Sequence, residues 1–192
     1  FKVLENGVVK GIVTWKMTRQ HSVANALATI AAAEHVGVSI ETACAALSNF
    51  GGVKRRMELL GTVRGIEVYD DFAHHPTAIE TTLDGARKRL AERKLWAIIE
   101  PRSNTMRMGS HKDGLAHSAR LADEVIWYQP EGLDWDLQPV IEAASNKAVV
   151  ARSLEDIIQT VVSEAGEGDA VVIMSNGGFG GLHQKLIAAL QA

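Results

Sequence analysis

The segments LWAIIE (residues 95–100) and AVVIMS (residues 170–175) decide the fold of this chain. Each is an almost unbroken run of apolar residues, which is typical of a strand covered on both faces of a parallel sheet. Helical and strand patterns alternate around them every 20–30 residues or so, and this alternation predicts right-handed βαβ crossovers. We therefore expect an α/β fold with a Rossmann-like, mainly parallel sheet and helices on both faces. The expected helices are 76–93, 110–122, 137–145, 153–165 and one from residue 182.

The first fifty residues show a different pattern of predicted elements. A hairpin is indicated by apolar alternation around the turn Glu5-Asn6-Gly7. Two helical patterns follow, the first with Ser22 as its expected N-cap and the second over residues 39–50, before Gly51-Gly52. We therefore predict a boundary between residues 52 and 53, with one domain over 1–52 and another over 53–192.

Composition limits the class of protein. The chain has 192 residues, 46% hydrophobic and 22% charged, which is enough to build a core. A net charge of −3 favours neither nucleic acid nor a membrane surface as a partner, and no apolar run approaches the roughly 20 residues that cross a bilayer. The single cysteine, Cys44, is expected to be a buried thiol in a reducing cytoplasm. The opening FKVLENG, without a methionine, suggests a fragment of a longer protein.

Polar or glycine-rich segments follow three of the predicted strands. They are DDFAHH (70–75), EPRSN (100–104) and SNGGFGG (175–181). Because ligands of open α/β sheets bind at the carboxyl ends of the strands, we expect these segments to share one site.

Each polar motif also has a plain structural interpretation. Adjacent histidines point in different directions, so His74-His75 is a poor metal-chelating pair, and one imidazole is expected to cap the helix that begins at Pro76. The run NGGFGG lacks the spacing of a dinucleotide fingerprint. The pair Arg55-Arg56 is either a solvated turn or a pair of cations directed at something bound near the domain boundary.

Four segments taken together strongly resemble the Mur ligases, the ATP-dependent amide-forming enzymes of peptidoglycan synthesis. They are KRRMELLG (54–61), VYDDFAHHPTAI (68–79), IEPRSNTMRMG (99–109) and MSNGGFGGLHQKL (174–186). The last two resemble the branch that joins the tripeptide L-Ala-γ-D-Glu-meso-diaminopimelate to UDP-N-acetylmuramate in peptidoglycan recycling. The resemblance implies that 1–52 is the end of a central ATPase domain and that 53–192 is the carboxyl-terminal domain.

The resemblance also implies nucleotide contacts. Asn25, in the stretch RQHSVAN, matches an adenine-binding asparagine, although Arg19 and Ser22 depart from the family motif. Arg56 matches the arginine that reaches the ATP phosphates, and Asp71 matches the aspartate near the ribose, so these two are the expected catalytic residues. Phe72 takes the position of an aromatic residue beside adenine. ATP and Mg²⁺ are the implied cofactors, with most Mg²⁺ ligands outside this chain.

The tripeptide is expected at the other two loops. Arg102 can grip carboxylates bidentately, and Asn104, Ser175 and Asn176 can add neutral hydrogen bonds. The chain has no P-loop motif, so we expect no ATPase activity from it alone. Two alternatives stay open: another Mur ligase, such as the L-alanine-adding enzyme, and a non-catalytic α/β module that binds a peptide or a nucleotide.

Overall fold

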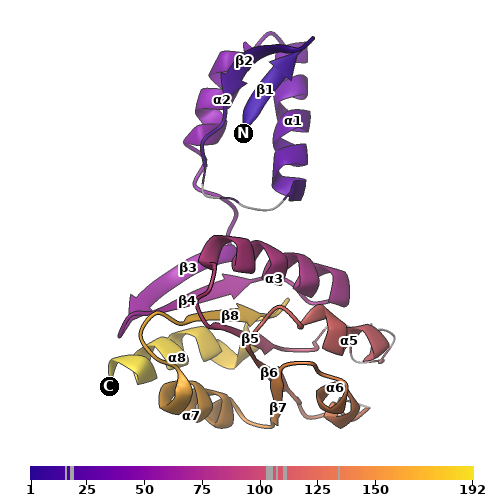
Figure 1. Cartoon of the computed structure of the whole chain (residues 1–192), viewed down its shortest axis with the longest axis vertical. Coiled ribbons are helices and arrows are strands. Elements are labelled where there is room, and N and C mark those ends of the chain that lie inside the picture. Colours follow the sequence, from indigo (N-terminus) through magenta and orange to yellow (C-terminus); the bar gives the residue numbers. More distant parts are fainter. Residues whose placement is uncertain (16, 18–19, 103–105, 107, 110–111, 134) are drawn as a thin grey trace. The chain divides into compact units, whose positions relative to one another are not determined.

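The computed structural model describes residues 1–15, 17, 20–102, 106, 108–109, 112–133 and 135–192. The chain divides into two compact units, Phe1–Val53 and Lys54–Ala192 (Figure 1). This division lies one residue after the boundary expected from the sequence. The assignment of the first unit to the end of an ATPase domain stays a prediction. No helix within the described part of the chain is long and apolar enough to cross a membrane.

The first unit is a hairpin packed on two helices. The hairpin strands pair antiparallel, as the turn at Asn6-Gly7 predicted. Ser39 accepts a hydrogen bond from the backbone of Thr42 and so caps the second helix, whereas Ser22 lies inside the first helix and does not cap it as expected. The Cys44 thiol is buried, as predicted, and burial raises its pKa. The elements are β1 (Lys2–Glu5), β2 (Val8–Ile12), α1 (Gln20–His35) and α2 (Ile40–Ser48).

The second unit is built on a six-stranded sheet in the order β3-β4-β8-β5-β6-β7. Only β3 pairs antiparallel, with β4, and the remaining neighbours are parallel. All five residues of β5 and of β8 are buried, as their unbroken apolar sequences require. The predicted α/β fold is confirmed. The strands are β3 (Arg56–Val63), β4 (Ile66–Asp71), β5 (Leu95–Ile99), β6 (Glu124–Tyr128), β7 (Lys147–Ala151) and β8 (Ala170–Met174).

Helices cover both faces of this sheet (Figure 1). One core lies between the sheet and α3, α5 and α6, and the other between the sheet and α7 and α8. Several predicted helices were too long at their carboxyl ends: the one predicted to reach residue 122 ends at Ser118, because residues 119–121 form turns. The helices are α3 (Pro76–Leu90), α5 (Lys112–Ser118), α6 (Gln138–Glu142), α7 (Leu154–Glu164), the 3₁₀ turn η1 (Phe179–Gly181) and α8 (Leu182–Gln191).

The strand order determines where a ligand can bind. β8 returns from the far side of the sheet and inserts between β4 and β5. The chain after β4 and β5 leads to helices on one face, and the chain after β8 leads to α8 on the other. In open α/β sheets, ligands usually bind at the carboxyl edge where the loops after neighbouring strands lead to opposite faces. The described residues of the three polar segments therefore lie at the middle of that edge.

Candidate functional site

Arg55 holds the carboxyl edge of the sheet together. Its guanidinium donates to the carbonyl oxygens of Ser175 at 2.6 Å and Gly177 at 2.8 Å, and its Nε donates to the Asp70 carboxylate at 3.1 Å. Its backbone N–H donates to the Glu58 carboxylate at 2.7 Å. Arg55 is therefore no solvated turn residue. It ties the start of the second unit to the loop after β8.

Arg56 takes no part in these hydrogen bonds among the described residues. The residues on either side of it, Arg55 and Met57, have positive φ angles of 58° and 52°, and the β3–β4 register shifts here. Such bulges redirect side chains and recur next to active sites. Arg56 is exposed, with its guanidinium 5.7 Å from the centre of the Phe72 ring. The bulge thus presents Arg56 as a cation at the edge, while its neighbour serves the fold.

Phe72 lies in a cluster of cations and imidazoles. The Arg55 guanidinium is 5.1 Å from the ring centre, and the His74 ring meets the Phe72 ring edge-on at 5.3 Å. His74 Nδ1 donates to the Phe72 carbonyl oxygen at 2.9 Å. His75 Nδ1 accepts the Ala78 N–H at 3.3 Å and caps α3, which confirms the expected capping imidazole. The ring is partly exposed, so one aromatic surface is held in place at the edge.

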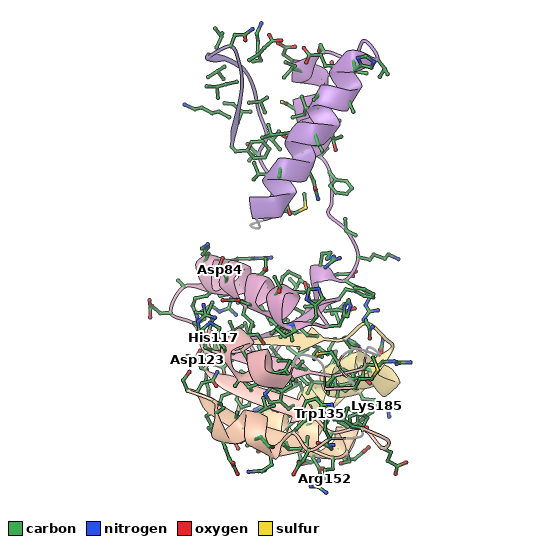
Figure 2. All side chains as sticks on the ribbon, turned by 90° about the vertical axis from the view of Figure 1, so that its right-hand side faces the viewer. Asp84, His117, Asp123, Trp135, Arg152 and Lys185 are labelled. Carbon is green, nitrogen blue, oxygen red and sulfur yellow. The ribbon has the colours of Figure 1, made fainter. Side chains whose placement is uncertain are left out.

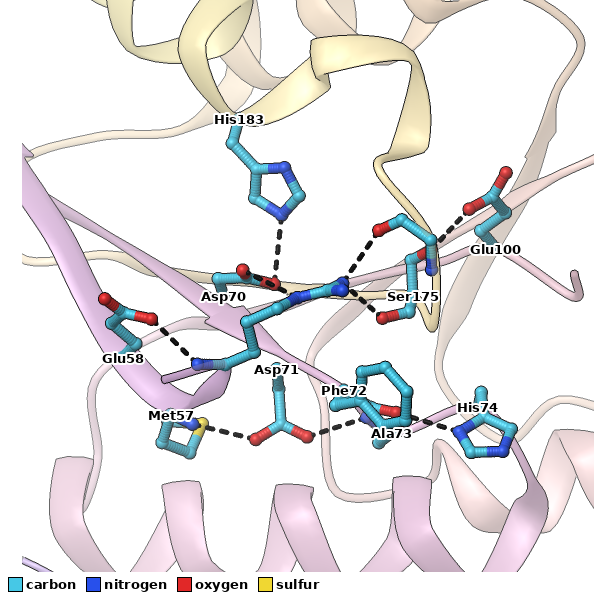
Figure 3. A network of polar contacts seen from close by, with 12 residues as sticks. Met57, Glu58, Asp70, Asp71, Phe72, Ala73, His74, Glu100, Ser175 and His183 are labelled. Carbon is cyan, nitrogen blue, oxygen red and sulfur yellow. Dashed lines mark hydrogen bonds and ion pairs between the residues drawn. The ribbon is translucent and has the colours of Figure 1, made fainter. Parts of the chain in front are cut away.

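The two aspartates at the end of β4 are buried. Asp71 is fully buried, and its carboxylate accepts the N–H groups of Met57 at 2.8 Å and Ala73 at 2.9 Å (Figure 3). It also accepts the Thr82 hydroxyl at 3.0 Å. In this arrangement Asp71 shapes the backbone beside Arg56 and Phe72. The prediction that it approaches a ribose stays untested. Asp70 and Asp71 are thus buried, hydrogen-bonded carboxylates and not solvated acids.

Sequence reasoning missed the partner of Asp70. His183, at the start of α8, donates from Nε2 to the Asp70 carboxylate at 3.1 Å, and both residues are buried. Figure 3 shows the His183 side chain extending from α8 toward Asp70. The two residues are 113 positions apart. The sequence offered one signal. His183 stands where a dinucleotide fingerprint would need a glycine, at the start of a helix that follows a buried strand.

Ser175 and Glu100 join the β8 and β5 loops. The fully buried Ser175 hydroxyl donates to the buried Glu100 carboxylate through a short hydrogen bond and accepts the Gly177 N–H at 2.9 Å (Figure 3). Ser175 was predicted to contact substrate, but its hydroxyl is engaged inside the protein. Whether it also contacts a peptide stays a prediction. Glu100 was not selected from the sequence.

Arg102 and Asn176 are better placed to meet a ligand. The exposed Arg102 side chain lies over Gly177, where a Cβ would come within 2.1 Å of Arg102 Nη1. The Asn176 Oδ1 is buried and accepts no hydrogen bond from the described residues. Buried acceptors are normally satisfied, so this oxygen is suited to a donor from outside the protein. Asn104 lies outside the described residues.

Asn25 belongs to the first unit. It lies in α1 and is exposed, and its backbone carbonyl accepts the Thr29 hydroxyl at 2.8 Å. Its predicted adenine contact stays a prediction. Arg19, one of the departures from the family motif, is outside the described residues. The residues described above as one site all belong to the second unit.

Residues 55–177 match the model of the family described as Mur ligase, glutamate ligase domain. The chain belongs to the Mur ligase family. Over its whole length it is 43% identical to the UDP-N-acetylmuramate–L-alanyl-γ-D-glutamyl-meso-2,6-diaminoheptandioate ligase of Haemophilus influenzae. It spans only 42% of that relative.

Two further Mur ligases refine the comparison. The crystal structure of a murein peptide ligase from Psychrobacter arcticus shares 59% identity with a TM-score of 0.74, covering 93% of this chain and 38% of that one. A UDP-N-acetylmuramate–L-alanine ligase from Desulfitobacterium hafniense is 31% identical over alignments covering 96% of this chain and 43% of the relative. The resemblance inferred from the four motifs is thus confirmed. The similarity is greater to the tripeptide-adding ligases than to this L-alanine ligase.

Proposed function

We propose that this chain serves an ATP-dependent Mur ligase that joins L-Ala-γ-D-Glu-meso-diaminopimelate to UDP-N-acetylmuramate in peptidoglycan recycling. The observation that carries the proposal is 43% identity over the entire chain to a ligase of that name. The activity belongs to a protein that combines this chain with the remaining length of its relatives. Its assignment to the cytoplasm rests on a sequence with one cysteine and so no internal disulfide.

The proposed chemistry has two steps. The muramate carboxylate attacks the γ-phosphorus of ATP, which gives an acyl phosphate and ADP. The peptide amine then attacks the acyl carbon, loses a proton, and expels inorganic phosphate from the tetrahedral intermediate. Both steps spread negative charge over oxygen atoms, so cations and positioning contribute most of the rate acceleration.

We assign the nucleotide end of the site to β4 and the bulge beside it. The exposed Arg56 is the proposed partner of the phosphoryl oxygens, because the bulge turns it outward while Arg55 is occupied. Phe72 is the proposed aromatic contact for adenine, with Asn25 as a further adenine contact from the first unit. Asp71 is proposed to act at the ribose, supported by its hydrogen bond to the Met57 backbone next to Arg56.

We assign the tripeptide to the loops after β5 and β8. Arg102 is the proposed carboxylate ligand, and Asn176 offers an unsatisfied amide oxygen to a ligand N–H. Ser175 keeps a supporting role in addition to any peptide contact, because its hydroxyl links Glu100 to Gly177. Asn104 is also proposed to contact the tripeptide, on its position in the sequence alone.

Magnesium is part of the proposal, although the described residues form no cluster of ligands for it. Within the described residues no three histidine, cysteine, aspartate or glutamate side chains gather as a metal site would require. The proposed Mg²⁺ therefore accompanies the ATP phosphates, with protein ligands in the part of the relatives that lies outside these residues. No step above is assigned to it.

An ADP-release assay tests the proposed function. A ligase carrying this chain is given ATP, UDP-N-acetylmuramate and either the tripeptide or L-alanine. ADP formation that depends on the tripeptide supports the proposal. Release with L-alanine alone would identify the L-alanine-adding reaction instead, and nucleotide or peptide binding without release would identify a non-catalytic module. The 192-residue chain by itself is expected to form no ADP, because its sequence has no P-loop.

A further inference from the structure

An open hollow lies at the carboxyl ends of β6 and β7, beyond the loops already described. Its volume is about 290 Å³. Figure 2 shows Trp135 and Arg152, two of its residues, at the same end of the second unit. The hollow is lined by Gln129, Leu133, Trp135, Asp136 and Arg152.

The walls of this hollow are fixed by internal hydrogen bonds. Both ends of the Gln129 amide are used: Nε2 donates to the Trp135 carbonyl and Oε1 accepts the Leu137 N–H, each at 3.1 Å. The Trp135 indole N–H donates to the Met106 carbonyl at 2.9 Å. Because the indole is already held by hydrogen bonds, it loses little conformational entropy when a ligand binds, and this favours binding.

The hollow carries one charge of each sign. Arg152 and Asp136 are both exposed, and neither side chain forms an ion pair with a described residue. Asp136 accepts only the Gln138 N–H, at 3.0 Å, among the described residues. Leu133 and Trp135 supply apolar surface between polar groups. A carboxylate, an ammonium group and a short aliphatic stem are the ligand groups that suit this combination.

The hollow adjoins two described residues of the segment that follows Arg102, namely Met106 and Gly109. The Met106 carbonyl accepts the Trp135 indole N–H, and a Cβ on Gly109 would stand 3.2 Å from the Trp135 ring. Sheet order places β5 between β8 and β6, so the carboxyl ends of β8, β5, β6 and β7 follow one another along this edge, from the loop with Gly177 to the hollow. Three strand spacings from β8 to β7 amount to roughly 14 Å.

We propose that the hollow binds a zwitterionic amino-acid terminus on an aliphatic stem, with Arg152 contacting its carboxylate and Asp136 its ammonium group. The proposal rests on the proposed function for the identity of the ligand, which is the free end of the tripeptide. A 2,6-diaminoheptanedioate residue attached through one amine keeps an amino-acid group at its other end. Three extended residues span roughly 10 Å, and the γ-linkage and the long third residue lengthen the peptide further, so it can reach from Arg102 to Arg152.

Binding to the 192-residue chain tests the site without any need for catalysis. Titration with the tripeptide, followed through ¹⁵N-labelled indole signals, is expected to shift the Trp135 signal, which Trp135→Phe identifies. The same peptide with L-lysine in third place lacks the terminal carboxylate and is expected to bind about tenfold or more weakly, as loss of a hydrogen-bonded charge predicts. Arg152→Ala should bring the two dissociation constants together, and Arg152→Lys should restore part of the difference.

The matched control removes a cation from the opposite edge of the sheet. Arg64 lies in the β3–β4 turn with a positive φ angle, so Arg64→Asn suits the backbone and should leave the ratio of dissociation constants unchanged. A Trp135 signal that does not respond to the tripeptide would overturn the proposal, as would equal losses for both peptides in Arg152→Ala. These outcomes are independent of ADP release, so failure of the site and failure of the proposed ligase reaction are distinguishable.

Discussion

The Arg55 guanidinium donates to the Ser175 carbonyl oxygen at 2.6 Å, although the two residues are 120 positions apart. Because the same guanidinium also contacts the Asp70 carboxylate, Arg55 connects the strand β4, the loop after β8 and the beginning of the second unit. The beginning of the second unit is therefore bound directly to the loop that we assign to the peptide.

Replacing the two adjacent arginines should separate stability from catalysis. Arg55→Ala removes charge-assisted hydrogen bonds to two carbonyls and leaves the buried Asp70 with His183 alone, so we expect a loss of about 1–3 kcal/mol in the free energy of unfolding. Arg56→Ala should leave stability nearly unchanged because Arg56 is exposed. In the ligase, Arg56→Ala should lower kcat on the order of 10³-fold, as for an arginine that meets phosphoryl charge.

Urea unfolding of the chain and steady-state kinetics of the ligase provide the two measurements. We expect Arg55→Ala to reduce kcat less than Arg56→Ala once both variants are compared well below their melting temperatures. Equal losses of kcat in two folded variants would show that the catalytic arginine is misassigned.

Asp71→Asn should chiefly destabilise the fold. The fully buried carboxylate accepts two backbone N–H groups and the Thr82 hydroxyl, and an asparagine turns an N–H toward at least one of these donors. We expect a loss of about 1–3 kcal/mol, measured by urea unfolding. The control is Asp84→Asn, which breaks only an exposed i,i+4 pair with Lys88 and should cost about 0.3–0.5 kcal/mol. Unchanged stability with weaker ATP binding would favour a purely direct ribose contact.

Gly177→Ala should act through Arg102. A Cβ at residue 177 overlaps the Arg102 guanidinium, whose flexible end can move aside, so stability should change little. We expect the KM for tripeptide to rise in Gly177→Ala and in Arg102→Ala, with the KM for ATP unchanged in both. The double variant should show no further rise in the KM for tripeptide. Gly178→Ala is the control, because nothing lies within 4 Å of its Cβ position. Additive losses in the double variant would contradict the contact.

Tyr69 should make stability depend on alkaline pH. Burial, assisted by the hydrogen bond from its hydroxyl to Glu67, raises its pKa to about 12 from 10.0. The folded state therefore keeps a proton that the unfolded chain loses, so this stabilisation is complete below pH 10 and disappears as pH rises through 12. Tyr69→Phe should flatten that part of the pH profile in urea unfolding. An identical slope in both proteins would show an ordinary pKa in the folded state.

Much of the second unit followed from local patterns. The apolar runs of β5 and β8 predicted buried parallel strands, and the proline after His75 marked the start of α3. Side-chain burial at the edge did not follow. Asp71 appears beside Asp70 as one of two polar residues at a strand end, yet both are buried because donors come from Met57, Thr82 and His183. Local sequence does not reveal partners that are supplied by other elements.

The sequence by itself determined the family, the α/β class and the edge of the sheet at which the polar loops gather. The reason is that hydrophobic periodicity and the order of motifs can be read without knowing any tertiary contact. Only the tertiary structure decided between Arg55 and Arg56: the difference depends on a bulge with positive φ angles and on carbonyl groups 120 and 122 positions away. It also decided that Trp135 and Arg152 share a hollow, because β6 and β7 bring their loops together at one edge.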